Sequence, residues 1–178
     1  MTCILGLRYR DQTWVGADAW IGDDQEQFVM DVPKVLTYPH FVLGFAGSLR
    51  AAQILENYAK FRGPKKSETE DRYFSGHIVS EIQRALLAQG FIKDVKTDVD
   101  VNFLVATSTK VAVIQDDFAV ISDRNGSVAI GSGSPATLGA LRMAQLMDLK
   151  PKEAMEKAFQ VGESLHPTVC GPYHIFKV

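Results

Sequence analysis

Short apolar runs of β-type residues recur along the chain, and glycine, proline or polar residues bound each of them. Such runs are typical of β-strands. Arg10 to Gln12 separate the first two runs, and Asp123 to Gly126 separate two later ones, so a hairpin is predicted at each place. Gly22 to Gln25 predicts a polar turn. The predicted strands cover residues 3–9, 13–19, 35–38, 41–45, 101–107, 110–114, 118–122, 127–131 and 172–178.

Between these runs the apolar residues follow a helical period. After Ser48 they recur at helical spacing as far as Phe61, which predicts a helix that Ser48 caps and that Gly63 and Pro64 stop. Three further helices are predicted over residues 71–89, 135–147 and 151–164, and Pro151 suits the first turn of the last one.

The order of elements is strands, two helices, strands, two helices and a strand. Because helices do not alternate singly with strands, a parallel sheet built from βαβ units is not expected, and the class is α+β. Two antiparallel sheets with helices outside them, four layers deep in an αββα sandwich, accommodate this order. The length of 178 residues fits a single domain over residues 1–178.

Composition narrows the function classes. Nineteen basic and 21 acidic residues give a net charge of −2, without the basic excess of a nucleic-acid-binding protein. The two cysteines, Cys3 and Cys170, cannot form a disulfide framework, and neither CxxC nor HExxH metal spacing is present. No signal pattern or long apolar run is seen, so we expect a cytoplasmic protein without a metal or cofactor.

The position of Thr2 makes it a candidate reactive residue. A small residue after Met1 favours removal of that methionine, which would leave Thr2 with a hydroxyl and a free α-amine on one residue. An α-amine has a pKa near ~8 and can act as a base near neutral pH. By position alone, Thr2 is more typical of an ordinary second residue.

Four other features are candidates for chemistry. Asp18 ends one apolar run and Lys34 begins another; each, taken singly, is also typical of a solvated sheet end. Two glycine-rich turns, 44–48 and 131–134, stand where a strand run meets a helical run. Such turns present backbone N–H groups that can bind an oxyanion.

Taken together, these residues resemble the proteasome β-subunit family, in which the HslV peptidases are included. The resemblance rests on five segments in order and covers nearly the whole chain: Thr2-Cys3-Ile4-Leu5-Gly6, Gly16-Ala17-Asp18, Lys34-Val35, Gly44-Phe45-Ala46-Gly47 and Ala129-Ile130-Gly131-Ser132-Gly133. It implies the αββα fold of N-terminal-nucleophile (Ntn) hydrolases and a threonine-type peptidase.

The resemblance also implies roles for individual residues. Thr2 is the nucleophile once Met1 is removed, Lys34 favours its ionised form, and Asp18 holds the Lys34 ammonium. Gly47 donates its backbone N–H to the oxyanion, and Ser132 orients the α-amine. By position, the substrate-binding residues are Ile21, Gly22, Val32, Ala46 and Arg50, with Ile54 behind them. Mostly apolar walls favour an apolar substrate side chain, whereas Arg50 favours an acidic one.

The chain departs from the family in two places. The family's aspartate near the nucleophile is missing from residues 164–171, where His166 and Thr168 are the candidates to replace it. Ile21 and Gly22 stand where the family has small hydroxyl residues, although main-chain pairing with a peptide does not depend on them.

The implied partners are peptides or unfolded proteins, further copies of the chain in a homo-oligomeric ring, and an ATP-dependent unfoldase. Two alternatives stay open. The first is a non-catalytic ring subunit of the same fold, and the second is an Ntn hydrolase of small amides.

Overall fold

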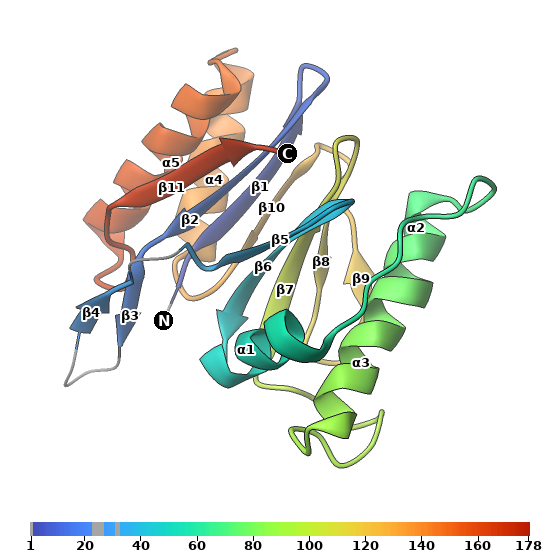
Figure 1. Ribbon diagram of the computed structural model, residues 1–178. Coiled ribbons are helices and arrows are strands. Elements are labelled where there is room, and N and C mark those ends of the chain that lie inside the picture. The colour runs from blue at the N-terminus through green and yellow to red at the C-terminus, as the bar shows by residue number, and fades with distance from the viewer. Residues whose placement is uncertain (1, 23–26, 31–32) are drawn as a thin grey trace.

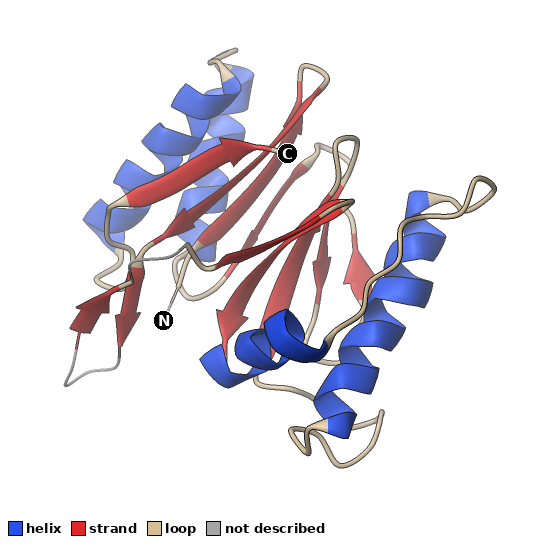
Figure 2. Ribbon diagram, in the orientation of Figure 1, coloured by secondary structure: helices blue, strands red, loops and turns tan. Residues whose placement is uncertain are grey.

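The computed structural model describes residues 2–22, 27–30 and 33–178, and these form a four-layer sandwich (Figures 1 and 2). The strands are β1 (Ile4–Tyr9), β2 (Gln12–Asp18), β3 (Trp20–Gly22), β4 (Gln27–Val29), β5 (Val35–Tyr38), β6 (Phe41–Gly47), β7 (Val101–Ala106), β8 (Val111–Ile114), β9 (Val120–Ile121), β10 (Ser127–Ile130) and β11 (Tyr173–Lys177). The helices are α1 (Leu49–Tyr58), α2 (Glu70–Arg72), α3 (Val79–Ala88), α4 (Ser134–Leu146) and α5 (Pro151–Leu165), and a π-helical stretch over Tyr73–Ile78 joins α2 to α3.

Both main sheets are antiparallel. The first has the strand order β10-β1-β2-β11 and the second β5-β6-β7-β8-β9, while β3 and β4 form a small hairpin. The tight turn from β1 to β2 has Arg10 and Asp11 at φ values of 50° and 58°, the left-handed conformation that matches the twist of a two-residue hairpin.

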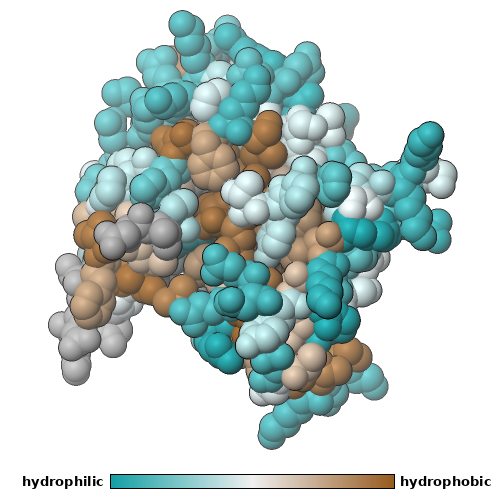
Figure 3. All heavy atoms as spheres, in the orientation of Figure 1, coloured by the Kyte–Doolittle hydropathy of each residue, from teal (hydrophilic) through white to brown (hydrophobic). Residues whose placement is uncertain are grey.

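Three apolar clusters lie between the four layers. Alternate residues of each strand point to opposite faces of a sheet, so Leu5 of β1 packs toward α4 and α5 while Ile4 packs between the sheets. In β6, Leu43 likewise packs toward α1 and α3, and Val42 packs between the sheets. Each sheet therefore buries both faces, and the predicted α+β sandwich is confirmed. Figure 3 shows hydrophilic residues over much of one face of the molecule, with apolar residues gathered near its middle.

Three local predictions are wrong. The first helix ends at Tyr58 rather than near Phe61, because Phe61 leaves the helix to pack its ring against Tyr38 and Phe41. The strand predicted over 118–122 shortens to β9, because Phe118 takes up a turn conformation with φ of 67°.

The third wrong prediction is the hairpin at residues 123–126. A turn is present there, closed by the Gly126 N–H donating to the Asp123 carbonyl at 3.1 Å. The strands on either side, however, pair in different sheets: β9 with β8 and β10 with β1. The turn therefore carries the chain from one sheet to the other. The small β3–β4 hairpin was not predicted, and the polar turn predicted there lies mostly at residues 23–26, outside the described residues.

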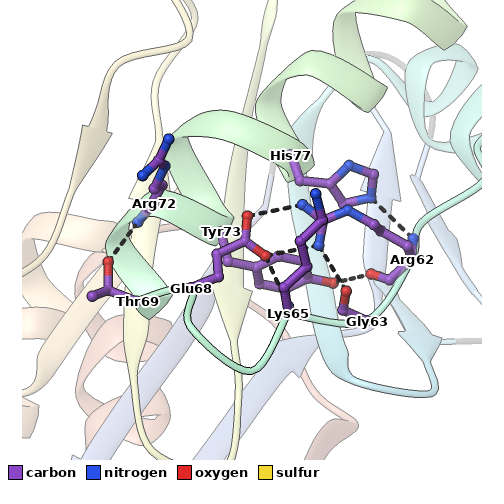
Figure 4. A network of polar contacts seen from close by, with 8 residues as sticks. All are labelled: Arg62, Gly63, Lys65, Glu68, Thr69, Arg72, Tyr73 and His77. Atoms are coloured by element: carbon purple, nitrogen blue, oxygen red, sulfur yellow. Dashed lines mark hydrogen bonds and ion pairs between the residues drawn. The ribbon is translucent and has the colours of Figure 1, made fainter.

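A polar network fastens the loop after α1 to the π-helical stretch (Figure 4). Arg62 forms two hydrogen bonds with the Glu68 carboxylate at 2.7 and 2.8 Å, and its backbone N–H donates to Nε2 of His77 at 2.9 Å. The Tyr73 hydroxyl donates to the Arg62 carbonyl. Because Nε2 accepts a hydrogen bond, this network requires neutral His77.

This requirement predicts a pH dependence of stability. Burial, assisted by the Arg62 charge, lowers the pKa of His77 below its usual 6.5. The unfolded chain therefore takes up this proton first, and the contribution of His77 to stability, complete above pH 6.5, is lost as the pH falls through the lower folded pKa. We expect the urea midpoint to fall between pH 7.5 and about 5.5 by more in the native chain than in His77→Gln, which accepts a hydrogen bond but does not titrate. Equal losses in the two proteins would contradict this role.

Candidate active site

Thr2 lies just before β1, on the wall of a cleft with a volume of 460 Å³. Ala46 and Gly47 from the end of β6 form one side of this cleft. Gly131 and Ser132, which follow β10, form another. The cleft therefore opens where strand ends from both sheets meet.

Lys34 bridges Thr2 and Asp18. Its Nζ donates a hydrogen bond of 2.9 Å to Thr2 Oγ1 and another of 2.9 Å to Asp18 Oδ1. The Cys3 N–H donates to the same Asp18 oxygen at 3.0 Å. The side chains of Lys34 and Asp18 are buried, and Thr2 is 6% exposed. The structure thus brings together three residues that follow one another at intervals of sixteen positions in the sequence.

The strand pairing explains why these three residues lie close together. The antiparallel β1–β2 pair places Asp18, at the end of β2, beside the start of β1, where the Asp18 N–H donates to the Cys3 carbonyl at 3.1 Å. Lys34 stands immediately before β5 of the second sheet, and its Nζ reaches the Asp18 carboxylate at the end of β2 in the first sheet. A hydroxyl is therefore held against an ammonium whose own position a carboxylate fixes.

The two charges influence each other strongly. Burial lowers the pKa of Lys34 and raises the pKa of Asp18, while their mutual attraction opposes both shifts. With hydrogen bonds at 2.9 Å, we regard the charged pair as the resting form. A Lys34 ammonium at this distance favours the ionised form of the Thr2 hydroxyl.

Removing one partner of this pair is expected to destabilise the fold. Lys34→Met leaves the Asp18 carboxylate buried without its cation, a change that typically costs about 3–5 kcal/mol. The double variant Lys34→Met with Asp18→Asn removes both charges and keeps an oxygen that accepts from the Cys3 N–H, so we expect it to regain most of the loss. Urea unfolding of the two variants measures this. Equal stabilities of the single and the double variant would contradict a strong coupling between the Lys34 and Asp18 charges.

Both glycine-rich turns need glycine, because a side chain in either would collide with a backbone carbonyl oxygen. Gly47 has a φ of 123°, and a Cβ there would lie 2.3 Å from the Asp100 carbonyl oxygen. Gly131 has a φ of 96°, and a Cβ there would lie 2.0 Å from the Thr2 carbonyl oxygen. Gly131 therefore permits the close approach of the second turn to Thr2, a role that the sequence analysis did not foresee.

The predicted substrate-binding residues are spread more widely than expected. Ala46 lies on the cleft wall. Ile21 and Gly22 are half-buried in β3 and Arg50 is exposed on α1, and none of the three is among the wall residues that the structure describes. Ile54 is buried in the core under α1, so it serves packing. Val32 lies outside the described residues.

The cleft wall also includes residues to which the sequence analysis gave no role in substrate binding. Asn102 of β7 and Gln115 after β8 supply amide groups, and Val113, Ala129 and Ile130 supply apolar surface. Among the described residues this wall carries no Asp, Glu, Lys or Arg side chain. Asn102, Val113 and Gln115 reach the cleft only through the folding of the second sheet, so no local sequence signal marks these three.

Ser132 lies on the cleft wall and bonds away from it to Thr168, with 2.8 Å between the hydroxyl oxygens. Within residues 2–22, 27–30 and 33–178, no group of three or more His, Cys, Asp or Glu side chains could hold a metal ion. No helix in the same ranges is long and apolar enough to cross a membrane.

Comparison with known proteins places this chain in a family. A family model described as proteasome subunit matches residues 1–166. The chain is similar to Thiobacillus denitrificans BPH, with a TM-score of 0.82 and 18% identity over 99% of this chain and 97% of that one. It is also similar to eukaryotic HslV from Trypanosoma brucei, with a TM-score of 0.70 and 21% identity over 99% and 98%. For the Gly-1 mutant of Anbu from Hyphomicrobium sp. strain MC1, the TM-score is 0.74 and the identity 16% over 98% and 80%. At these identities the structures establish a shared fold.

Proposed function

Because this chain belongs to the proteasome subunit family, we propose that it is a threonine-type peptidase whose nucleophile is Thr2 after removal of Met1. One observation carries the proposal: the buried Lys34 ammonium contacts both Thr2 Oγ1 and Asp18 Oδ1 on the wall of a cleft. An amino-terminal hydroxyl residue with an adjacent buried cation combines a nucleophile, a base and the charge that activates the nucleophile.

The first half of the reaction forms an ester. Thr2 Oγ1 bonds to the scissile carbonyl carbon, and the hydroxyl proton passes to the Thr2 α-amine. The Gly47 N–H donates to the oxyanion that forms, and one such donor is typically worth about 2.7–4 kcal/mol. When the C–N bond of the peptide breaks, the departing amine takes the proton from the α-ammonium.

The second half uses water in place of the hydroxyl. The α-amine removes a proton from water as the water oxygen attacks the ester carbon. Collapse of the second oxyanion breaks the bond to Thr2 Oγ1, which takes back a proton, and the peptide acid leaves. Lys34 and Asp18 keep their charges throughout, so their contribution is electrostatic and positional.

The substrate that suits this cleft is an extended peptide with uncharged side chains beside the cleaved bond. The amides of Asn102 and Gln115 and the absence of charged side chains from the described wall support this choice. This preference for uncharged side chains takes the place of the preference for an acidic side chain that Arg50 suggested. Backbone groups of Ile21 and Gly22 in the short strand β3 are candidates to pair with the peptide.

We further propose that the chain works in a homo-oligomeric ring in the cytoplasm, with an ATP-dependent unfoldase for folded substrates. Family membership supports the ring and the unfoldase. A non-catalytic ring subunit is the alternative that one observation favours, since residues 164–171 lack the family's aspartate and Ser132 contacts the hydroxyl of Thr168 instead.

A panel of fluorogenic peptides and small amides tests the proposal. The chain is prepared with Thr2 at its amino terminus, and its oligomeric state is measured by light scattering. We expect cleavage of peptides with uncharged side chains before the bond. Turnover of small amides alone would support an amide hydrolase, and no turnover of either class by an assembled, processed chain would support a non-catalytic subunit.

A further inference from the structure

A line of side-chain hydrogen bonds leaves the cleft at Ser132 and ends on an imidazole. Ser132 Oγ lies 2.8 Å from Thr168 Oγ1, which in turn lies 2.7 Å from Nδ1 of His166. Thr168 is buried and His166 is half-buried, at the end of α5. We call Ser132, Thr168 and His166 the hydroxyl relay.

The backbone fixes the direction of this relay. The Thr168 N–H also points at Nδ1 of His166, at 3.4 Å. An amide N–H can only donate, so Nδ1 must be an acceptor and the imidazole carries its hydrogen on Nε2. The Thr168 hydroxyl therefore donates to Nδ1, and its oxygen accepts the hydrogen of Ser132. That uses the only hydrogen of the Ser132 hydroxyl and leaves its lone pairs for the cleft.

The backbone of Thr2 lies close to this end of the relay. The β1–β10 register pairs Ile4 with Ile130, and its continuation by two residues sets Thr2 opposite Ser132. Gly131 approaches Thr2 so closely that a Cβ on it would lie 2.0 Å from the Thr2 carbonyl oxygen. Thr2 and Ser132 also line the same cleft.

We propose that Thr168 and His166 are positioning residues that hold Ser132 as a hydrogen-bond acceptor for the α-amine of Thr2. This inference rests on the proposed function, because it concerns the amine that serves there as the base. The proton taken from Thr2 Oγ1 stays on that amine, and Ser132 accepts one N–H of the resulting ammonium. An acceptor favours the protonated amine and so assists the proton transfer. Thr168 and His166 thus hold the acceptor for the α-amine in place by hydrogen bonds, where the missing aspartate would act through its charge.

Matched variants of the relay test this inference in chains that begin at Thr2, made by cleaving a fusion immediately before that residue. Thr168→Val removes the hydroxyl at constant shape, and Thr168→Ser keeps it. His166→Leu removes the acceptor, and His166→Asn keeps a polar atom near the position of Nδ1. Lys34 and Asp18, the charged side chains that face Thr2, are unchanged in all four variants.

The first readout is the pH midpoint for acylation of the Thr2 α-amine, followed by mass spectrometry, which requires no peptidase activity. We expect Thr168→Val and His166→Leu to shift this midpoint to lower pH. On peptides we expect kcat to fall about tenfold with KM changed by less than about twofold. Thr168→Ser and His166→Asn should rescue both readouts relative to their partners.

The outcomes separate the relay from its alternatives. An unchanged midpoint in His166→Leu and Thr168→Val, with only a lower thermal unfolding temperature, would overturn the inference and leave the relay as an anchor for the loop after α5. Should Thr168→Val fail to fold, His166→Leu decides alone, since its half-exposed side chain lies at the outer end. A shifted midpoint in a chain that cleaves no peptide would support the relay and count against the proposed function.

Discussion

Thr2→Ala is expected to abolish peptide hydrolysis and to leave the fold intact. Alanine keeps the α-amine and the small side chain that favours removal of Met1, so the variant lacks only the attacking oxygen. The lost hydroxyl accepts a hydrogen bond from Lys34, whose bond to Asp18 remains. Steady-state hydrolysis of a fluorogenic peptide measures the effect. We expect a rate indistinguishable from that of the uncatalysed reaction.

Thr2→Ser is the matched control for this loss. It keeps both the hydroxyl and the amine and removes one methyl group, so measurable turnover should survive. Circular dichroism and thermal unfolding verify that both variants are folded. Undiminished turnover by Thr2→Ala would remove Thr2 as the nucleophile, and equal loss in both variants would show that the hydroxyl is not the group that matters.

A chain that retains Met1 is expected to lose most of its activity, although every side chain of the site is present. Its free amine belongs to Met1, and the nitrogen of Thr2 is an amide that cannot accept a proton. Loss of a positioned base typically costs 10²–10⁴-fold, so we expect a fall of about a thousandfold. Two fusions, cleaved before Met1 or before Thr2, give the two chains for side-by-side assay.

Intact mass verifies each preparation before its rate is measured. Treatment of the Met1 chain with a methionine aminopeptidase should restore activity in proportion to the fraction processed. Equal rates in the two chains would show that the base is a group other than the α-amine of Thr2.

Much of the fold follows from periodicity in the sequence. Strand runs and helical spacing locate most elements, because burial of one helix face or both sheet faces demands those periods. The segment before residue 127 shows the limit. Asp123 to Gly126 forms the turn that its residues favour, yet β10 leaves β9 and pairs with β1 in the other sheet. Which edge a strand joins depends on tertiary packing, and turn residues do not encode it.

Some residues of the site can be predicted from the sequence, and others can be found only in the folded chain. Thr2, Asp18 and Lys34 stand at strand boundaries with a regular spacing that a family resemblance can recognise, and the structure brings them together. Asn102 and Gln115 reach the cleft only through the order of strands in the second sheet. Thr168 was considered as a replacement for the aspartate, but its bonds to both Ser132 and His166 are visible only in the folded chain.

Locating the covalent intermediate tests whether Thr2 is the nucleophile. The chain that begins at Thr2 is mixed with a slowly hydrolysed peptide ester, quenched in acid, digested and mapped by mass spectrometry. We expect one acyl group, attached to Thr2 through its side-chain oxygen and absent from Thr2→Ala. An acyl group on any other residue, or steady turnover during which Thr2 is never acylated, would contradict this expectation.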